Sequence, residues 1–189
     1  MYVKPIVRLA LEVSAQAHKD QVRKGTHTPY IVHPVGVMLV CAEYTNSPET
    51  LAAALLHDVL EDCADVYSED QMRREFGNEI TGTVLAVTKD ASITDWRNRN
   101  EQYLVNLRAA YNGSALLVSL ADKVSNLVDV LEDHEAMSGA MWEKFNAGKD
   151  EQLWWYDAVH KLMLDTIPDH PLVLKYGKLV DELAIIVHD

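Results

Sequence analysis

The sequence predicts an all-α fold on three observations. Apolar residues recur at helical spacing along most of its 189 residues, and several of these segments begin at a capping residue. No stretch alternates apolar and polar residues for long enough to require a strand. Hydrophobic residues make up 48% of the chain, so a helical bundle of this length can form its own core.

Four helices are expected in the first part of the chain: one with apolar spacing over residues 6–17 that ends before Gly25, and others at residues 34–40 and beyond, 47–62, and 68–77. The first repeats apolar residues at intervals of three and four, and the second has a proline in its first turn. The third begins with the capping residue Ser47, followed by a proline and an acidic residue. Ser68 opens the fourth helix, and Gly77 closes it.

Four more helices are expected, at residues 94–111, 116–131, about 151–166 and about 170–187. Thr94 caps the first of these, and Asn112-Gly113 ends it. The others follow from apolar residues at helical spacing. Because the chain has no internal repeat and no linker, we expect residues 1–189 to form a single domain.

The acidic charge of the chain argues against nucleic acids and membranes as partners. The net charge is −12, whereas nucleic acid and anionic lipid are bound by basic surfaces. The apolar runs are also far shorter than the ~20 residues that span a bilayer. A small phosphorylated substrate remains compatible with this charge, because a bound metal and a few cations can reverse the potential inside one pocket. The sequence leaves the oligomeric state open, a homo-oligomer included.

The cysteines and the N-terminus favour a cytoplasmic location. Cys41 and Cys63 are too far apart for a CxxC signature, so we expect two buried thiols in a reducing compartment. The first residues lack the apolar stretch and cleavage site of a signal peptide.

A cluster of ionisable residues follows the apolar run at residues 51–56. His57, Asp58, Glu61 and Asp62 fall within one sector of about 140° on the expected helix. An unpaired carboxylate buried there would protonate unless a positive charge compensated it. A divalent cation is the simplest compensation, and mixed nitrogen and oxygen donors suit Mn²⁺, Fe²⁺ or Co²⁺. The cluster therefore predicts a transition-metal site.

Two residues elsewhere in the chain are candidates for further metal ligands. His33 lies where an extended segment enters a helix, and Asp122 interrupts an apolar helix with Asn126 one turn further along the same face. Taken singly, His57-Asp58 also fits a polar helix end, His33 a hydrogen-bonded histidine, and Asp122 a salt-bridge partner. Their joint occurrence favours a metal.

Six stretches of the chain form a recognisable pattern: Ala17-His18, Gln21-Val22-Arg23-Lys24-Gly25, Thr28-Pro29-Tyr30-Ile31-Val32-His33-Pro34, Ala53-Ala54-Leu55-Leu56-His57-Asp58-Val59-Leu60-Glu61-Asp62, Phe76-Gly77 and Leu120-Ala121-Asp122-Lys123-Val124-Ser125-Asn126-Leu127. In order and spacing they resemble the HD-domain metal-dependent phosphohydrolases. Within these, the chain is most similar to the RelA/SpoT-type (p)ppGpp hydrolases and the small alarmone hydrolases. The resemblance covers about residues 10–130, and C-terminal helices follow at about residues 140–189.

The resemblance implies an HD-domain helical bundle and a metal-dependent reaction. The implied ion is Mn²⁺, and the implied ligands are His33, His57, Asp58 and Asp122. The implied reaction is removal of the 3′-pyrophosphate of (p)ppGpp, in which a metal lowers the pKa of water and offsets charge on the phosphoryl oxygens.

The same resemblance implies roles for residues around the metal. Glu61 and Asp62 match an acidic pair that orients and deprotonates the attacking water. Arg23 and Lys24 match a basic pair near the substrate, and Asn126 matches a polar contact to the nucleotide.

Three departures from the family pattern concern the substrate rather than the metal. Cys63 replaces a common threonine, Ser125 stands where histidine or tyrosine is frequent, and Val128 stands where arginine is frequent. Two alternatives therefore remain: an HD nucleotidase or phosphodiesterase acting on another nucleotide, and a non-catalytic nucleotide-binding module. Because the chain ends at Asp189, we expect alarmone degradation without synthesis.

Overall fold

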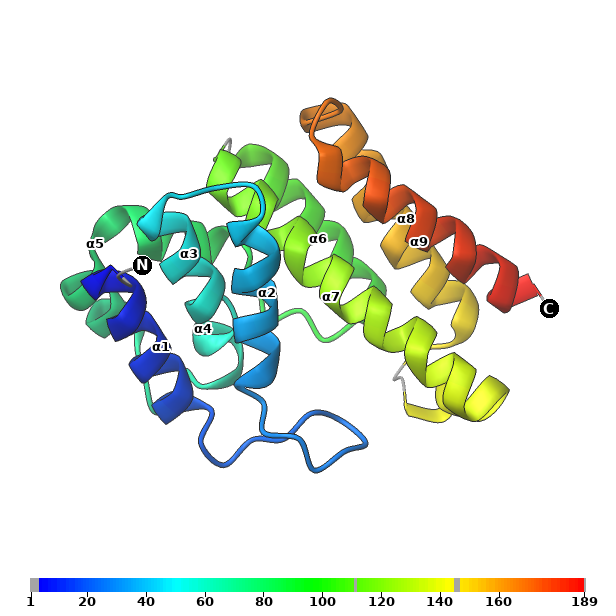
Figure 1. The fold of residues 1–189 in the computed structure, drawn as a ribbon, viewed down its shortest axis with the longest axis horizontal. Coiled ribbons are helices and arrows are strands. Elements are labelled where there is room, and N and C mark those ends of the chain that lie inside the picture. The colour runs from blue at the N-terminus through cyan, green and yellow to red at the C-terminus, as the bar shows by residue number, and fades with distance from the viewer. Residues whose placement is uncertain (1–3, 111, 145–146, 189) are drawn as a thin grey trace. The chain divides into compact units, whose positions relative to one another are not determined.

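The computed structural model describes residues 4–110, 112–144 and 147–188 (Figure 1). Its elements are α1 (Pro5–Ala17), α2 (Val32–Ala42), α3 (Pro48–Leu56), α4 (Val59–Asp62), α5 (Glu69–Ala86), α6 (Trp96–Ala109), α7 (Gly113–Met137), the 3-10 helix η1 (Ser138–Lys144), α8 (Lys149–Thr166) and α9 (Pro171–His188). The predicted all-α fold is confirmed: over the described residues the only β pairing is one isolated bridge, between Val22 and Pro29. None of the described helices is both long enough and apolar enough to cross a membrane.

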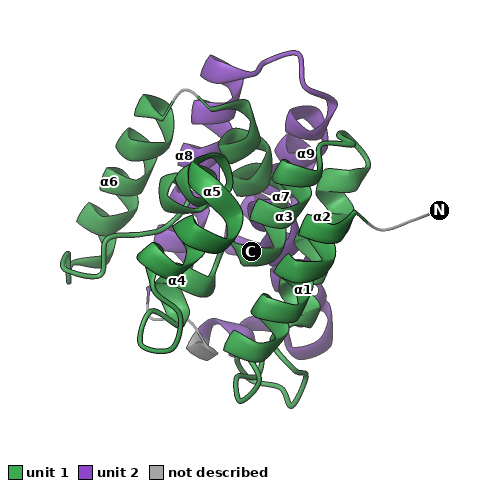
Figure 2. Ribbon diagram, turned by 90° about the vertical axis from the view of Figure 1, so that its left-hand side faces the viewer, with its two compact units in different colours: residues 1–121 green, residues 122–189 purple. Residues whose placement is uncertain are grey.

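The chain divides into two compact units, residues 1–121 and residues 122–189, and the division falls within α7 (Figure 2). In the first unit α3 packs against α1, α2 and α5. The α3 side chains from Ala52 to Leu56 are at most 1% exposed, so this helix forms the core of the unit. In the second unit α8 packs against α9, and a Cβ added at Gly177 would lie 2.8 Å from the His160 ring. The single-domain organisation stays a prediction.

The third predicted helix is interrupted at two residues. α3 ends at Leu56 and α4 begins at Val59, so the prediction of one continuous helix is wrong. In a continuous helix the Ala54 carbonyl would accept the amide hydrogen of Asp58, four residues on. Here Nδ1 of His57 lies 2.8 Å from that carbonyl oxygen. A side-chain donor thus takes the place of a backbone donor, and His57 and Asp58 lie in the turn between the two helices.

Glycine ends one helical segment as predicted, but another follows at once. Gly77 has φ 77° and ψ 177°, a conformation that essentially only glycine adopts, and α5 continues beyond this kink to Ala86. The segment after Gly77 lacks a strong start signal, which is why the sequence did not reveal it. Asp95, rather than the predicted Thr94, caps α6 by accepting the Asn98 amide hydrogen. The predicted end of that helix, at residue 111, lies outside the described residues.

We predict that Gly77→Ala lowers the free energy of unfolding by about 1–3 kcal/mol, because an L side chain would be held at positive φ. No atom lies within 4 Å of the added Cβ, so the cost comes from the backbone rather than from a clash. Urea denaturation followed by circular dichroism measures the change. Gly82→Ala in the same helix is the matched control and should raise the free energy of unfolding by about 0.5–1 kcal/mol. Equal effects of the two substitutions would contradict this interpretation.

Candidate metal centre

Three of the predicted ligands meet in the first unit. His33 lies in the first turn of α2, and His57 and Asp58 lie in the turn between α3 and α4. One donor atom from each residue lies within 4.8 Å of the other two, the arrangement of a possible metal site. His33 and His57 are buried, and Asp58 is half-buried. The packing of α2 on α3 brings together residues that are 24 positions apart in the sequence.

Hydrogen bonding fixes the tautomer of His57. A carbonyl oxygen can only accept, so the Nδ1 atom that faces Ala54 must carry the hydrogen, and in the neutral ring Nε2 then presents a lone pair. That Nε2 atom lies 3.0 Å from Oδ2 of Asp58, and Nε2 of His33 lies 3.5 Å from the same oxygen. A lone pair and a carboxylate oxygen repel each other at this distance unless a proton or a cation lies between them. The donor set therefore fits a divalent cation, which would relieve the repulsion between His57 and Asp58.

A tyrosine contacts the same carboxylate oxygen. The Tyr30 hydroxyl donates a hydrogen bond of 2.6 Å to Oδ2 of Asp58. The Tyr30 ring packs edge-on against His33, with 5.8 Å between ring centroids, and lies tilted against the His18 ring at 4.8 Å. The Arg23 guanidinium lies 5.8 Å from the centre of the Tyr30 ring, in cation–π contact. Tyr30 thus joins a predicted metal ligand to a predicted substrate-binding residue.

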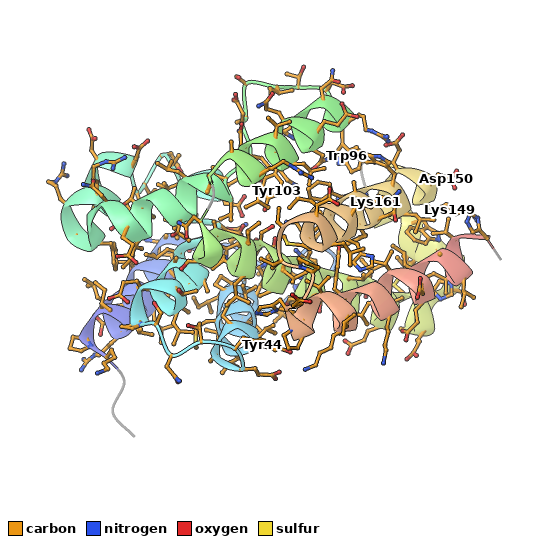
Figure 3. The ribbon with its side chains drawn as sticks, turned by 90° about the horizontal axis from the view of Figure 1, so that it is seen from above. Tyr44, Trp96, Tyr103, Lys149, Asp150 and Lys161 are labelled. Atoms are coloured by element: carbon orange, nitrogen blue, oxygen red, sulfur yellow. The ribbon has the colours of Figure 1, made fainter. Side chains whose placement is uncertain are left out.

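Glu61, one of the two predicted catalytic acids, is held by the segment after α5. The Lys89 amide donates a hydrogen bond of 2.9 Å to Oε2 of Glu61. The Lys89 ammonium lies 5.8 Å from the centre of the Tyr103 ring, on α6. Tyr103, labelled in Figure 3, is 2% exposed, and its hydroxyl is hydrogen-bonded to Ser119 at 2.7 Å. Glu61 is therefore tied to the core of the unit although its own side chain is exposed.

Asp62, the other predicted acid, is held from a different direction. The Gln21 amide donates a hydrogen bond of 2.9 Å to Oδ2 of Asp62, and Oε1 of the same Gln21 lies 2.7 Å from Nδ1 of the buried His18. Cys63 lies against His18, with 3.4 Å between its sulfur and Nδ1. Burial, followed by the negative charge of the neighbouring Asp62, raises the pKa of the Cys63 thiol to about 11, which keeps this side chain neutral beside the site.

The remaining predicted ligand, Asp122, begins the second unit. Its Oδ1 accepts a hydrogen bond of 2.5 Å from the Asn126 amide one turn along α7, and its Oδ2 contacts the Lys123 ammonium. Lys123 is 7% exposed and lies 5.4 Å from the centre of the Trp155 ring. Both oxygens of Asp122 are therefore oriented by cationic or amide donors. Its place among the metal ligands, and the contact of Asn126 with a nucleotide, stay predictions.

The predicted basic pair lies on a hairpin between α1 and α2. The Arg23 amide donates to the Thr28 carbonyl and the Tyr30 amide to the Gln21 carbonyl, each at 2.9 Å, and Gly25 has φ 77° in the bend. Arg23 is half-buried and Lys24 is exposed. A substrate-contacting pair must be accessible, and neither residue is buried in the core. Their contact with a substrate stays a prediction.

The sequence did not reveal three residues that hydrogen-bond to the predicted site carboxylates. Tyr30 and Gln21 lie inside the motifs that the sequence analysis quoted, yet neither was given a role. Lys89 acts through its backbone amide, which leaves no signal in side-chain chemistry.

A family model described as HD domain matches residues 10–146, which is more than half of the chain. A guanosine-3′,5′-bis(diphosphate) 3′-pyrophosphohydrolase of Aquifex aeolicus (strain VF5) is 36% identical over 122 residues, covering 64% of this chain and 17% of that relative. A GTP pyrophosphokinase of Streptomyces coelicolor is 30% identical over 188 residues, covering 96% of this chain and 21% of that relative. The chain thus spans about a fifth of the length of these curated relatives.

Two solved structures share the fold. The structure of a metazoan ortholog of SpoT, a protein that hydrolyses ppGpp and plays a role in starvation responses, matches with a TM-score of 0.80 and 27% identity. That match covers 96% of this chain and 97% of the other. The protein lmo0812 of Listeria monocytogenes EGD-e matches with a TM-score of 0.70 and 25% identity, over 80% of this chain and 97% of the other. With the family match and the His33, His57 and Asp58 cluster, these likenesses show that the chain belongs to the HD-domain family.

Proposed function

We propose that this chain is a metal-dependent phosphohydrolase that removes the 3′-pyrophosphate of (p)ppGpp. The observation that carries the proposal is the cluster of His33, His57 and Asp58, whose donor atoms lie within 4.8 Å of one another. The relatives named as guanosine-3′,5′-bis(diphosphate) 3′-pyrophosphohydrolases, and the ppGpp-hydrolysing structural neighbour, support the substrate. The partner is then a small nucleotide, and we propose that the reaction takes place in the cytoplasm.

We further propose Mn²⁺ as the ion and Asp122 as the fourth ligand. Two imidazole nitrogens with two carboxylates form a mixed donor set, which suits Mn²⁺ better than a purely oxygen-binding ion such as Mg²⁺. When bound, such an ion lowers the pKa of water and offsets negative charge on phosphoryl oxygens. The acidic surface of a chain with net charge −12 makes this local positive charge necessary for a polyphosphate substrate.

The remaining chemistry falls to residues of the chain. The Glu61 carboxylate accepts the proton of the attacking water, and the water oxygen forms a bond to the phosphorus attached to the 3′ oxygen. The bond from that phosphorus to the 3′ oxygen breaks, and the 3′ oxygen takes up the proton that Glu61 accepted, which releases pyrophosphate and the 3′ hydroxyl and leaves Glu61 ionised again. Asp62 orients the water beside Glu61. Arg23 and Lys24 neutralise charge on the substrate phosphates, while Asn126 contacts the nucleotide.

Two substitutions separate metal binding from proton transfer. Asp58→Ala removes an oxygen ligand and is expected to abolish both Mn²⁺ binding and pyrophosphate release. Glu61→Gln retains an acceptor for the Lys89 amide but no base, so Mn²⁺ binding should persist while kcat falls by about 10²–10⁴-fold. Isothermal titration with Mn²⁺ and a pyrophosphate assay measure the two effects. Asp65→Ala and Glu79→Gln, at exposed carboxylates, are the matched controls. Normal turnover by Asp58→Ala would refute the site assignment.

Metal-stripped protein given ppGpp should release pyrophosphate only after Mn²⁺ is added. The unusual Ser125 and Val128 favour one rival, an HD nucleotidase or phosphodiesterase, so nucleoside monophosphates and cyclic nucleotides belong in the same assay. Orthophosphate from monophosphates, with no pyrophosphate from ppGpp, would replace the proposed substrate. Tight binding of ppGpp without hydrolysis in the presence of Mn²⁺ would instead indicate a non-catalytic module.

A further inference from the structure

Two side chains of the α1–α2 hairpin reach two carboxylates of the site. Tyr30 donates from its hydroxyl to Oδ2 of Asp58 at 2.6 Å, and Gln21 donates from its amide to Oδ2 of Asp62 at 2.9 Å. The two carboxylates are four residues apart in the sequence. One short segment, the hairpin between α1 and α2, contacts both of them. Neither Tyr30 nor Gln21 carries a charge, so both can orient a carboxylate without competing with a cation for it.

The two donors are joined to each other. The Tyr30 amide donates to the Gln21 carbonyl at 2.9 Å, the pairing that closes the base of the hairpin. His18 contacts both side chains: its Nδ1 lies 2.7 Å from Oε1 of Gln21, and its ring lies 4.8 Å from the Tyr30 ring. His18 is 2% exposed and lies directly after α1. The hairpin is therefore fixed to the core of the unit at the point from which it contacts the site.

The orientation of the Gln21 amide follows from its two partners. Its nitrogen must face Asp62, because an ionised carboxylate only accepts, and its oxygen then faces His18, whose Nδ1 carries the hydrogen. The chain from His18 through Gln21 to Asp62 is thus a directed pair of hydrogen bonds. Tyr30 has a comparable fixed direction, since its hydroxyl donates to Asp58.

We propose that Tyr30 and Gln21 are positioning residues: Tyr30 fixes the Asp58 carboxylate for the metal, and Gln21 fixes the Asp62 carboxylate for the reaction. The Gln21 part rests on the proposed function, whereas the Tyr30 part requires only that the site binds a divalent ion. Partners of this kind, one shell outside the ligands, contribute about 10–100-fold to metal affinity or to activity. Because the same hairpin carries Arg23 and Lys24, it aligns the carboxylates and the substrate-binding cations as one unit.

The first test measures Mn²⁺ affinity without any substrate. Tyr30→Phe keeps the ring and its packing against His18 and removes only the hydroxyl, so the Kd for Mn²⁺ should rise by about ten-fold or more. Tyr67→Phe is the matched control, because the Tyr67 hydroxyl also donates to a carboxylate, Glu75, at 2.8 Å on α5. Its Kd should match that of the wild type. Equal Kd values for Tyr30→Phe and the wild type would overturn the proposal, as would a wild-type chain that bound no divalent ion.

The second test measures turnover. Gln21→Leu should lower kcat by about ten-fold, with KM and the Kd for Mn²⁺ within about two-fold of the wild type. The matched control is Gln71→Leu, which removes the amide that donates to Glu75 at 3.1 Å. A parallel loss of Mn²⁺ affinity and kcat in Gln21→Leu would mean that Gln21 only supports folding. An unchanged kcat would show that Gln21 does not position Asp62 for the reaction. If the wild type binds Mn²⁺ but releases no pyrophosphate, the proposed function fails. The Kd of Tyr30→Phe for Mn²⁺ then still tests whether Tyr30 positions Asp58 for the metal.

Discussion

One carboxylate oxygen lies at the centre of the candidate metal site. Oδ2 of Asp58 lies within 3.5 Å of a hydroxyl and of two imidazole nitrogens, one of which presents a lone pair. The hydroxyl donates to this oxygen, but the His57 lone pair and the carboxylate repel each other unless a proton or a cation lies between them. The fold holds these residues in the turn between α3 and α4 and in the first turn of α2. The packing of these helices thus brings the three donor groups together, and hydrogen bonds to Ala54 and from Tyr30 orient His57 and Asp58.

The helices packed around α3 hold the turn that carries His57 and Asp58 in place. The apolar α3 is buried on all sides by α1, α2 and α5, so its end cannot move without disturbing the core. The break after Leu56 costs helical hydrogen bonds, and the bond from His57 to the Ala54 carbonyl offsets part of that cost. Asp58 is thereby turned toward His33 instead of continuing along a helix. Local backbone irregularity at a functional site is the expected pattern, because the surrounding packing compensates for it.

The all-α fold and several of its helices could be predicted from the sequence. The predictions that were wrong, and the contacts that were missed, have physical reasons. The confirmed predictions depend on strong local signals: apolar spacing for α1 and α9, and a serine cap followed by proline for α3. Donor chemistry made His33 a candidate ligand, and the resemblance to the HD-domain family implied its pairing with His57 and Asp58. The helix break was missed because it depends on one side chain displacing a backbone donor. The roles of Tyr30 and Lys89 were missed because they arise only from tertiary contacts between distant segments.

The proposed function requires a divalent ion among His33, His57 and Asp58. The most direct measurement is anomalous diffraction at the manganese edge from crystals grown with Mn²⁺. We expect a single strong anomalous peak within bonding distance of Nε2 of both histidines and of the Asp58 carboxylate, with the Tyr30 hydroxyl still donating to that carboxylate. A Mn²⁺-saturated crystal with no peak there, and with a protonated His57 hydrogen-bonded directly to Asp58, would contradict it.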